Sequence, residues 1–172
     1  MSARSRWCLV VVAVLGLGGA CDDAPSAAEA WCDGVCSAVE RCNVGAASCR
    51  STCVRDRPGL AKQSASGAQA QRPCLAHLSC GALSGDDAAW KSEVDACWNQ
   101  AELSVAVTDR VRRFCPDYAL AWFECGYNLP LDECEHTYSM WSDSVIERVA
   151  ACETSLDCDG FQTCISNAFS SL

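Results

Sequence analysis

The 172-residue sequence lacks the motifs by which most enzymes and metal proteins are recognised. Beyond residue 20 it holds no Gly-x-Ser-x-Gly nucleophile elbow, phosphate-binding loop or dinucleotide fingerprint. It has 16 cysteines, yet no two are spaced as Cys-x-x-Cys, so the thioredoxin-like motif, the zinc knuckle and the haem attachment motif are excluded. We therefore expect no catalytic residues, no metal ligands and no cofactor.

Histidine is also scarce, with only His77 and His136 present. His136 follows Glu133 at an i, i+3 helical spacing and adjoins Glu135, so the acidic second half around His136 is the one candidate catalytic site. Residues 117 to 147 are the candidate region for weak cation binding. A general base needs a positioned partner, and a catalytic metal usually needs three protein ligands. A solvated acidic face is thus the favoured interpretation, and His77 is expected to be a packing or surface residue.

Residues 157 to 160, Asp-Cys-Asp-Gly, match only part of a calcium loop. In that loop Ser155 would take the first position and Ser166 the last, where a bidentate glutamate is needed. We expect Asp159 to cap a helix that begins near Phe161 instead.

Large apolar side chains are few for a chain of this length. Leucine, isoleucine, valine, methionine and the aromatics number about 35 after residue 20. Disulfide bonds offset such a shortfall, because each typically contributes roughly 2 to 4 kcal/mol. The five tryptophans of this region are expected to fill the core, although Trp90 and Trp98 could form an exposed patch for a protein or glycan partner.

Positive charge is missing from much of the second half. The formal net charge is −9, and no lysine or arginine lies between Arg113 and Arg148. Nucleic acid is therefore not an expected partner, since its binding requires basic side chains against phosphates.

The first 20 residues predict an export signal. Arg4 and Arg6 precede an apolar run of about ten residues, and Gly18, Gly19 and Ala20 supply small residues before the cleavage point. A bilayer-spanning helix needs roughly twenty apolar residues, so this run is too short to be one.

Cys21 directly follows this signal, and the segment resembles a bacterial lipoprotein signal, in which the cysteine after the cleaved bond carries diacylglycerol. Leu17 lies four residues before Cys21 where the family has three, and Gly18 takes the expected place. Ordinary secretory cleavage, giving a soluble secreted protein, is the alternative. The number of cysteines favours lipid attachment, because 15 cysteines follow residue 20 and an odd number cannot all pair. If Cys21 carries lipid, the other 14 can form seven bridges. The chain as a whole resembles the small cysteine-rich lipoproteins of bacterial envelopes, which implies membrane attachment and a helical disulfide scaffold.

Helical periodicity predicts a mainly α fold of disulfide-stapled helical hairpins. After a tether over residues 21–30, we expect one cysteine-rich unit over 31–100 and a second over 101–172. Ser26 and Glu29 form a capping-box pattern for the first helix. Residues 58–73 read as a surface loop, and Pro73 and Pro116 read as helix starts.

The cysteine spacing suggests that the two units are degenerate copies. The first set can be laid against the second in chain order, namely Cys32, Cys42, Cys49, Cys74, Cys80 and Cys97 against Cys115, Cys125, Cys134, Cys152, Cys158 and Cys164. Cys36 and Cys53 have no counterparts. We therefore predict a Cys36–Cys53 bridge nested outside Cys42–Cys49, with Cys125–Cys134 as the equivalent of the inner bridge. The other eight cysteines are expected to be bridged in a pairing that the sequence leaves open.

The leading hypothesis for function is a non-catalytic module in the extracytoplasmic envelope, tethered to the membrane through lipid on Cys21. It would serve binding or assembly, and the sequence identifies neither its partner nor its oligomeric state. An extracytoplasmic enzyme using the region around His136, and a weak cation-binding protein, are the alternatives.

Overall fold

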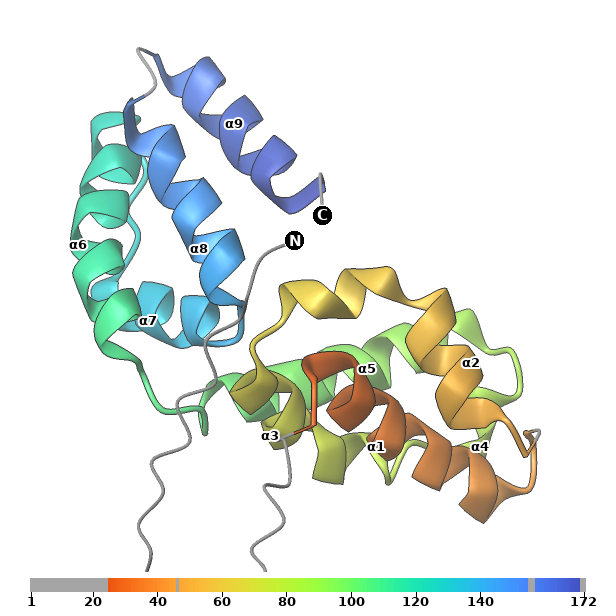
Figure 1. Ribbon diagram of the computed structural model, residues 1–172. Helices are drawn as coiled ribbons and strands as arrows, with labels where there is room; N and C mark the ends of the chain where they lie inside the picture. The colour runs from red at the N-terminus through yellow and green to blue at the C-terminus, as the bar shows by residue number, and fades with distance from the viewer. Residues whose placement is uncertain (1–24, 46, 155–156, 171–172) are drawn as a thin grey trace, which may run out of the picture.

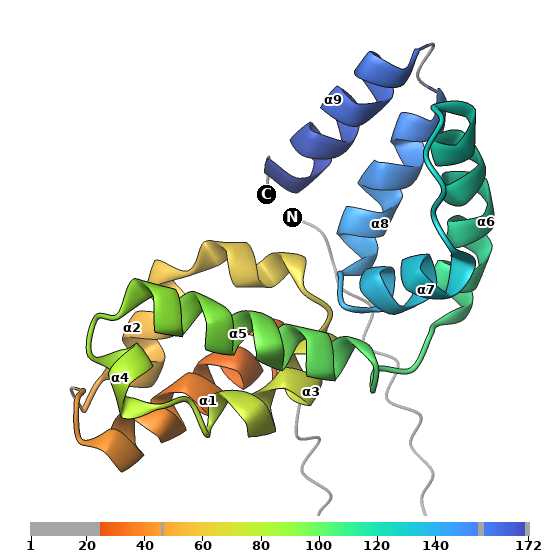
Figure 2. The ribbon, with the colours of Figure 1, turned by 180° about the vertical axis from the view of Figure 1, so that it is seen from behind.

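The computed structural model describes residues 25–45, 47–154 and 157–170. Within these ranges the chain forms nine α-helices and two short 3₁₀ helices, with no β-strand, which confirms the predicted mainly α class. The helices gather into two lobes, α1 to α5 and α6 to α9 (Figures 1 and 2). Their bounds are α1 Ala27–Cys42, α2 Cys49–Asp56, η1 Pro58–Lys62, α3 Ala65–Leu75, α4 Cys80–Leu83, α5 Asp87–Glu102, α6 Asp109–Glu124, α7 Leu131–Ser139, α8 Asp143–Ala150, η2 Ala151–Thr154 and α9 Cys158–Ser170.

Helix α1 organises the first lobe and begins as the sequence predicts. The Ser26 side chain accepts a hydrogen bond from the Glu29 backbone N–H, and the Glu29 carboxylate accepts one from the Ser26 N–H, which completes the capping box. One face of α1 is buried against α2, α3 and η1. Because α1 lies between these elements, it supplies the largest share of the first core.

Helix α3 corrects the expectation of a loop over residues 58–73. Ser64 caps this helix, and its buried face carries Gly67, Ala68, Gln71 and Leu75. Gly34 of α1 lets Arg72 and Leu75 of α3 approach closely, and Gly67 lies against the Met140 backbone, so the scarcity of large apolar residues reflects close packing and not a loop. Pro73 lies inside α3 and does not start a helix.

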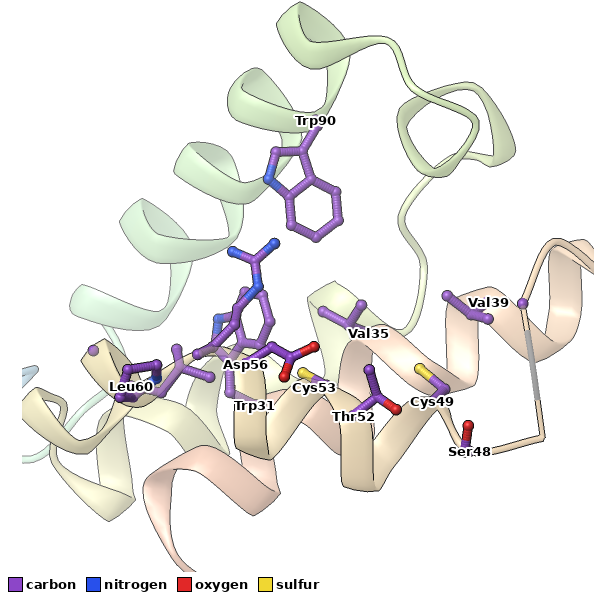
Figure 3. A pocket seen from close by; sticks show the side chains of 14 residues that line it. Trp31, Val35, Val39, Ser48, Cys49, Thr52, Cys53, Asp56, Leu60 and Trp90 are labelled. Carbon is purple, nitrogen blue, oxygen red and sulfur yellow. The ribbon is translucent and has the colours of Figure 1, made fainter.

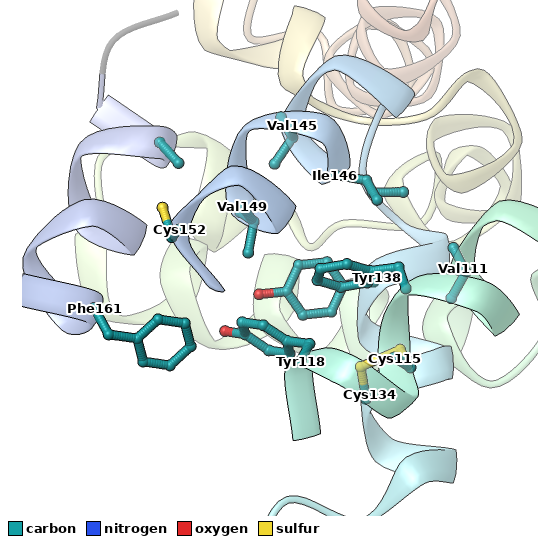
Figure 4. Close-up of a cluster of buried hydrophobic side chains, with 12 residues drawn as sticks. Val111, Cys115, Tyr118, Cys134, Tyr138, Val145, Ile146, Val149, Cys152 and Phe161 are labelled. Atoms are coloured by element: carbon teal, nitrogen blue, oxygen red, sulfur yellow. A yellow bond between two sulfur atoms is a disulfide. The ribbon is translucent and has the colours of Figure 1, made fainter. Parts of the chain in front are cut away.

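The second lobe is built around aromatic side chains. The Tyr118 ring contacts those of Phe114, Tyr138 and Phe161, and the valines of α8 belong to the same buried cluster (Figure 4). Burial raises the pKa of the Tyr138 phenol, and the neighbouring Tyr118 adds to the rise. Helix α6 begins at the Thr108 cap, so Pro116 lies within this helix and the predicted start at Pro116 is wrong.

The 14 cysteines from Cys32 onward form seven disulfides, which confirms structural bridging as their role. All seven lie within a lobe, and none connects the two lobes. The pairs are Cys32–Cys53, Cys36–Cys49, Cys42–Cys80, Cys74–Cys97, Cys115–Cys134, Cys125–Cys158 and Cys152–Cys164. Bridges of this number are typical of proteins that fold in an oxidising compartment outside the cytoplasm.

The three predicted pairings, Cys36–Cys53, Cys42–Cys49 and Cys125–Cys134, are wrong, and helix geometry explains why. Cys32 and Cys36 lie one turn apart on α1 and face the matching pair on antiparallel α2. Cys42 lies six residues beyond Cys36, about 240° further around the helix, so it points away from α2. It reaches the start of α4 instead.

Two of the three bridges of the second lobe have counterparts in the first lobe under the predicted alignment, whereas the counterpart of Cys115–Cys134, a Cys32–Cys49 bridge, is not formed. Cys42–Cys80 and Cys125–Cys158 each join the end of the first helix of a lobe to the start of a later helix. Cys74–Cys97 and Cys152–Cys164 occupy aligned positions as well. In the first lobe two bridges, Cys32–Cys53 and Cys36–Cys49, join the first two helices. In the second lobe Cys115–Cys134 is the single bridge between α6 and α7.

The lobes meet through a small set of contacts around Met140, which is fully buried. The Ser64 backbone N–H donates to the Met140 carbonyl at 2.9 Å, and the Trp98 and Trp141 rings lie 5.1 Å apart between centroids. None of the described helices has the length and apolar character needed to cross a bilayer.

Candidate functional site

A groove of about 880 Å³ lies in the first lobe. Its walls come from α1, α2, η1 and the start of α5, and its lining is largely apolar (Figure 3). This volume lies within the range of small-molecule sites, roughly 300 to 1,000 Å³. We define this hollow as the tryptophan groove, after Trp31 and Trp90, which lie at one end of it.

One face of α1 forms the apolar side of the tryptophan groove. Trp31, Val35 and Val39 recur at four-residue spacing and therefore lie in a row along the helix. Cys49 and Cys53 of α2 line the opposite wall, and their disulfides to α1 hold the two helices at a fixed distance. The groove is thus built on two covalently joined helices and needs no movement to form.

Arg57 supplies the cation at the aromatic end. Its guanidinium carbon lies 5.4 Å from the Trp31 ring centroid and 5.5 Å from that of Trp90. The two indoles meet edge to face with their centroids 6.2 Å apart. A guanidinium at these distances is held by cation–π attraction to both rings. Arg57 itself is exposed, because it follows the end of α2.

Asp56 also lines the groove, but its charge is already compensated. Arg55 donates to the Asp56 carboxylate from Nε at 2.7 Å and from Nη2 at 3.3 Å. The hydrogen bond from Arg55 lowers the pKa of Asp56. Among the described residues no carboxylate forms an ion pair with Arg57, so the groove presents one uncompensated positive charge.

Trp90 and Trp98, which the sequence assigns either to the core or to an exposed patch, pack against different partners. Trp90 packs on Trp31 in the first lobe, whereas Trp98 packs on Trp141 between the lobes. Both are half-buried. Trp90 and Trp98 therefore do not act together as one exposed patch.

The surroundings of His136 group no set of metal ligands in the described part of the chain. His136 lies half-buried on α7, and its Nδ1 is buried without a hydrogen-bond partner in the described part of the chain. Glu133 is exposed on the same helix, and the next residue, Thr137, instead donates to Glu102. Across residues 25–45, 47–154 and 157–170, no three histidine, cysteine or acidic side chains are grouped to hold a metal ion.

His77 lines a second, smaller hollow of about 440 Å³, together with Glu93 and the Cys74–Cys97 bridge. Glu93 accepts hydrogen bonds from the Ser79 backbone N–H at 2.7 Å and from its hydroxyl at 2.5 Å. These bonds lower the pKa of Glu93 and keep it ionised. Its carboxylate therefore caps α4 and is occupied in doing so.

The remaining predicted positions lie at the edges of the structure. Cys21 falls outside the described residues. Asp157, and not Asp159, caps α9, because its carboxylate accepts from the Gly160 N–H at 2.7 Å. The helix starts at Cys158, three residues before the expected Phe161, so the cap is placed correspondingly earlier.

The sequence did not reveal the tryptophan groove. Trp31 and Trp90 lie on helices far apart in the chain, and Arg57 precedes a stretch that reads as a loop. No local periodicity connects three such positions. The i, i+4 row from Trp31 to Val39 was the one available signal, and it indicated a buried helix face only.

No protein-family model, curated protein or solved structure matches the chain.

Proposed function

We propose that the protein is a non-catalytic, extracytoplasmic binding module, tethered to the membrane by lipid on Cys21, whose ligand occupies the tryptophan groove. The observation that carries this proposal is the groove itself, a preformed apolar hollow with one unpaired cation at its end. A small number of polar groups in an apolar hollow is typical of ligand sites.

The disulfide framework supports binding over catalysis. Two bridges fix α1 to α2 on either side of the groove, so little conformational entropy is lost when a ligand enters. The polar side chains of its lining are those of Ser48, Thr52, Asp56 and Arg57, and Arg55 binds the Asp56 carboxylate, which is the one candidate base among them. Neither histidine lines it.

A capture experiment tests the binding function. Immobilised mature protein is incubated with an envelope extract, and the retained proteins, glycans and lipids are identified by mass spectrometry. Thr52→Trp adds bulk to the half-exposed groove wall and should abolish retention of the ligand. Phe123→Ala changes an exposed aromatic of the second lobe and should leave retention unchanged.

The two variants make the outcome decisive. A component kept by wild type and Phe123→Ala but lost by Thr52→Trp supports the groove as the binding site. Equal retention by all three proteins rejects it.

The tether is tested separately by intact mass. The membrane-bound protein should be heavier than the polypeptide 21–172 by its acyl groups, and Cys21→Ser should release it into the soluble fraction. Finding the mature wild-type chain unmodified and in the soluble fraction would contradict the lipid anchor and support ordinary secretion. Multiple acyl chains are expected, because a single chain anchors only marginally.

A further inference from the structure

We infer that the tryptophan groove binds a medium-chain fatty acid, with its carboxylate on Arg57 and its acyl chain along α1. This inference rests on the proposed binding function and names the ligand class of the same groove. It is carried by two features that the structure brings together, an unpaired guanidinium and a row of apolar side chains that leads away from it.

Arg57 is suited to a carboxylate. Its guanidinium packs against the indoles of Trp31 and Trp90, and such packing leaves the N–H donors in the guanidinium plane available. A carboxylate can accept two parallel hydrogen bonds from these donors. The indoles also exclude water from one side of the pair, which strengthens the attraction between the charges.

The α1 wall is suited to an acyl chain. Trp31, Val35 and Val39 span eight residues of helix, about 12 Å, which is roughly the length of a ten-carbon chain. The cystine sulfurs at Cys49 and Cys53 continue the apolar lining on the α2 wall. An extended apolar chain bound here would bury its surface without leaving a polar group unpaired.

An extended peptide fits the same groove less well. An extended peptide needs a strand edge to pair its backbone N–H and C=O groups, and the groove walls are helices whose own backbone groups are bonded internally. Peptide groups laid on the apolar floor would lose their hydrogen bonds to water without replacement. An acyl chain carries no such groups.

The charge of the groove discriminates among amphiphiles. Asp56 is the one acidic lining residue, and Arg55 already neutralises it. An anionic head is therefore attracted to Arg57, whereas a quaternary ammonium head would meet a like charge. A neutral head gains only the apolar contacts of its chain.

Three twelve-carbon probes test this inference on the intact mature protein, the two ionic ones below their micelle concentrations and the alcohol below its solubility limit. Dodecanoate, dodecanol and dodecyltrimethylammonium are titrated by calorimetry, and tryptophan fluorescence follows the same titrations. Wild type should bind dodecanoate at least about tenfold more tightly than dodecanol. Arg57→Gln should remove this preference and leave dodecanol binding unchanged.

Arg50→Gln is the matched control. Arg50 is also exposed on α2, but it pairs with Asp33 outside the groove lining, so the variant makes the same change in net charge. It should keep the preference for dodecanoate. An equal loss in Arg50→Gln and Arg57→Gln would overturn a specific role for Arg57.

Two other results would also overturn the inference. One is binding of dodecanol or of the ammonium probe as tight as that of dodecanoate, and the other is failure of the folded wild type to bind dodecanoate. If either result occurs while envelope capture still depends on Thr52, the fatty-acid assignment falls and the binding function stands. Circular dichroism of each variant confirms that the helical fold is retained.

Discussion

Gly34 sets the closest approach of two backbones in the first lobe. A Cβ added at this position would lie 2.7 Å from the Arg72 carbonyl oxygen and 2.8 Å from the Cβ of Leu75. Both are closer than real Cβ atoms come to their neighbours. Glycine is therefore required here by the contact between α1 and α3, although it costs helix propensity.

Gly34→Ala should lower the free energy of unfolding by about 2 kcal/mol, because the strain of overpacking exceeds the gain in helix propensity. Chemical denaturation with the disulfides intact measures the change. Gly59→Ala is the control, since no atom lies within 4 Å of the added methyl group. Similar stability of the Gly34→Ala and wild-type proteins would contradict the close α1–α3 packing.

Glu93 provides a pH-dependent contribution to stability. The Ser79 hydroxyl and N–H groups that donate to its carboxylate lower its pKa in the folded protein below the reference value of 4.5. A lowered folded-state pKa stabilises the protein above the unfolded-state pKa, and this stabilisation is lost as the pH falls through the folded-state value.

Glu93→Gln should therefore be less stable than wild type at pH 7, and the difference should shrink in acid. Thermal unfolding of both proteins at pH 7 and at pH 3 measures this effect. A difference between the two proteins that is the same at both pH values would assign the effect to lost packing and not to ionisation.

At the scale of the elements, disulfides replace much of the apolar packing that other helical lobes use. Each lobe has a first helix whose end is bridged to the start of a later one, by Cys42–Cys80 and by Cys125–Cys158. The segments closed by the bridges differ in length, from 12 residues for Cys152–Cys164 to 38 for Cys42–Cys80. Longer closed segments restrict the unfolded chain more strongly.

Replacing Cys42 and Cys80 together by alanine should therefore cost about 1 kcal/mol more than replacing Cys152 and Cys164. Denaturation of the two double variants under non-reducing conditions gives the comparison, with peptide mapping to show that the other six bridges are retained. An equal loss would mean that native packing, and not the length of the closed segment, determines the contribution of each bridge.

At the scale of the whole molecule, the two lobes are joined by contacts that no disulfide reinforces. Met140 is fully buried with Ala101 and Val105, which lie at the end of α5 and in the connecting segment. The Ser142 N–H donates to the Lys62 carbonyl at 2.8 Å beside this cluster. The lobes therefore form one structure through a small apolar centre with a rim of backbone hydrogen bonds.

Met140→Ala should cost about 2 to 5 kcal/mol, because it opens a cavity in this centre. Calorimetry of the variant should then show two unfolding transitions, one for each lobe. These transitions should lie further apart in temperature than those of wild type. Leu103→Ala alters a side chain that is 75% exposed in the connecting segment and should leave the thermogram unchanged. A single sharp transition for Met140→Ala would show that the lobes are coupled through other contacts.

The sequence by itself determined the helical class, the structural role of the cysteines and the Ser26 cap of α1, because each depends on composition or on residues within one or two helical turns. It did not determine α3, whose small buried residues resemble a loop until α1 is placed against them. The bridge pairing and the tryptophan groove were decided only by the tertiary structure. Both depend on how far each helix is rotated about its axis when it packs, and this rotation is fixed by contacts between residues distant in the chain.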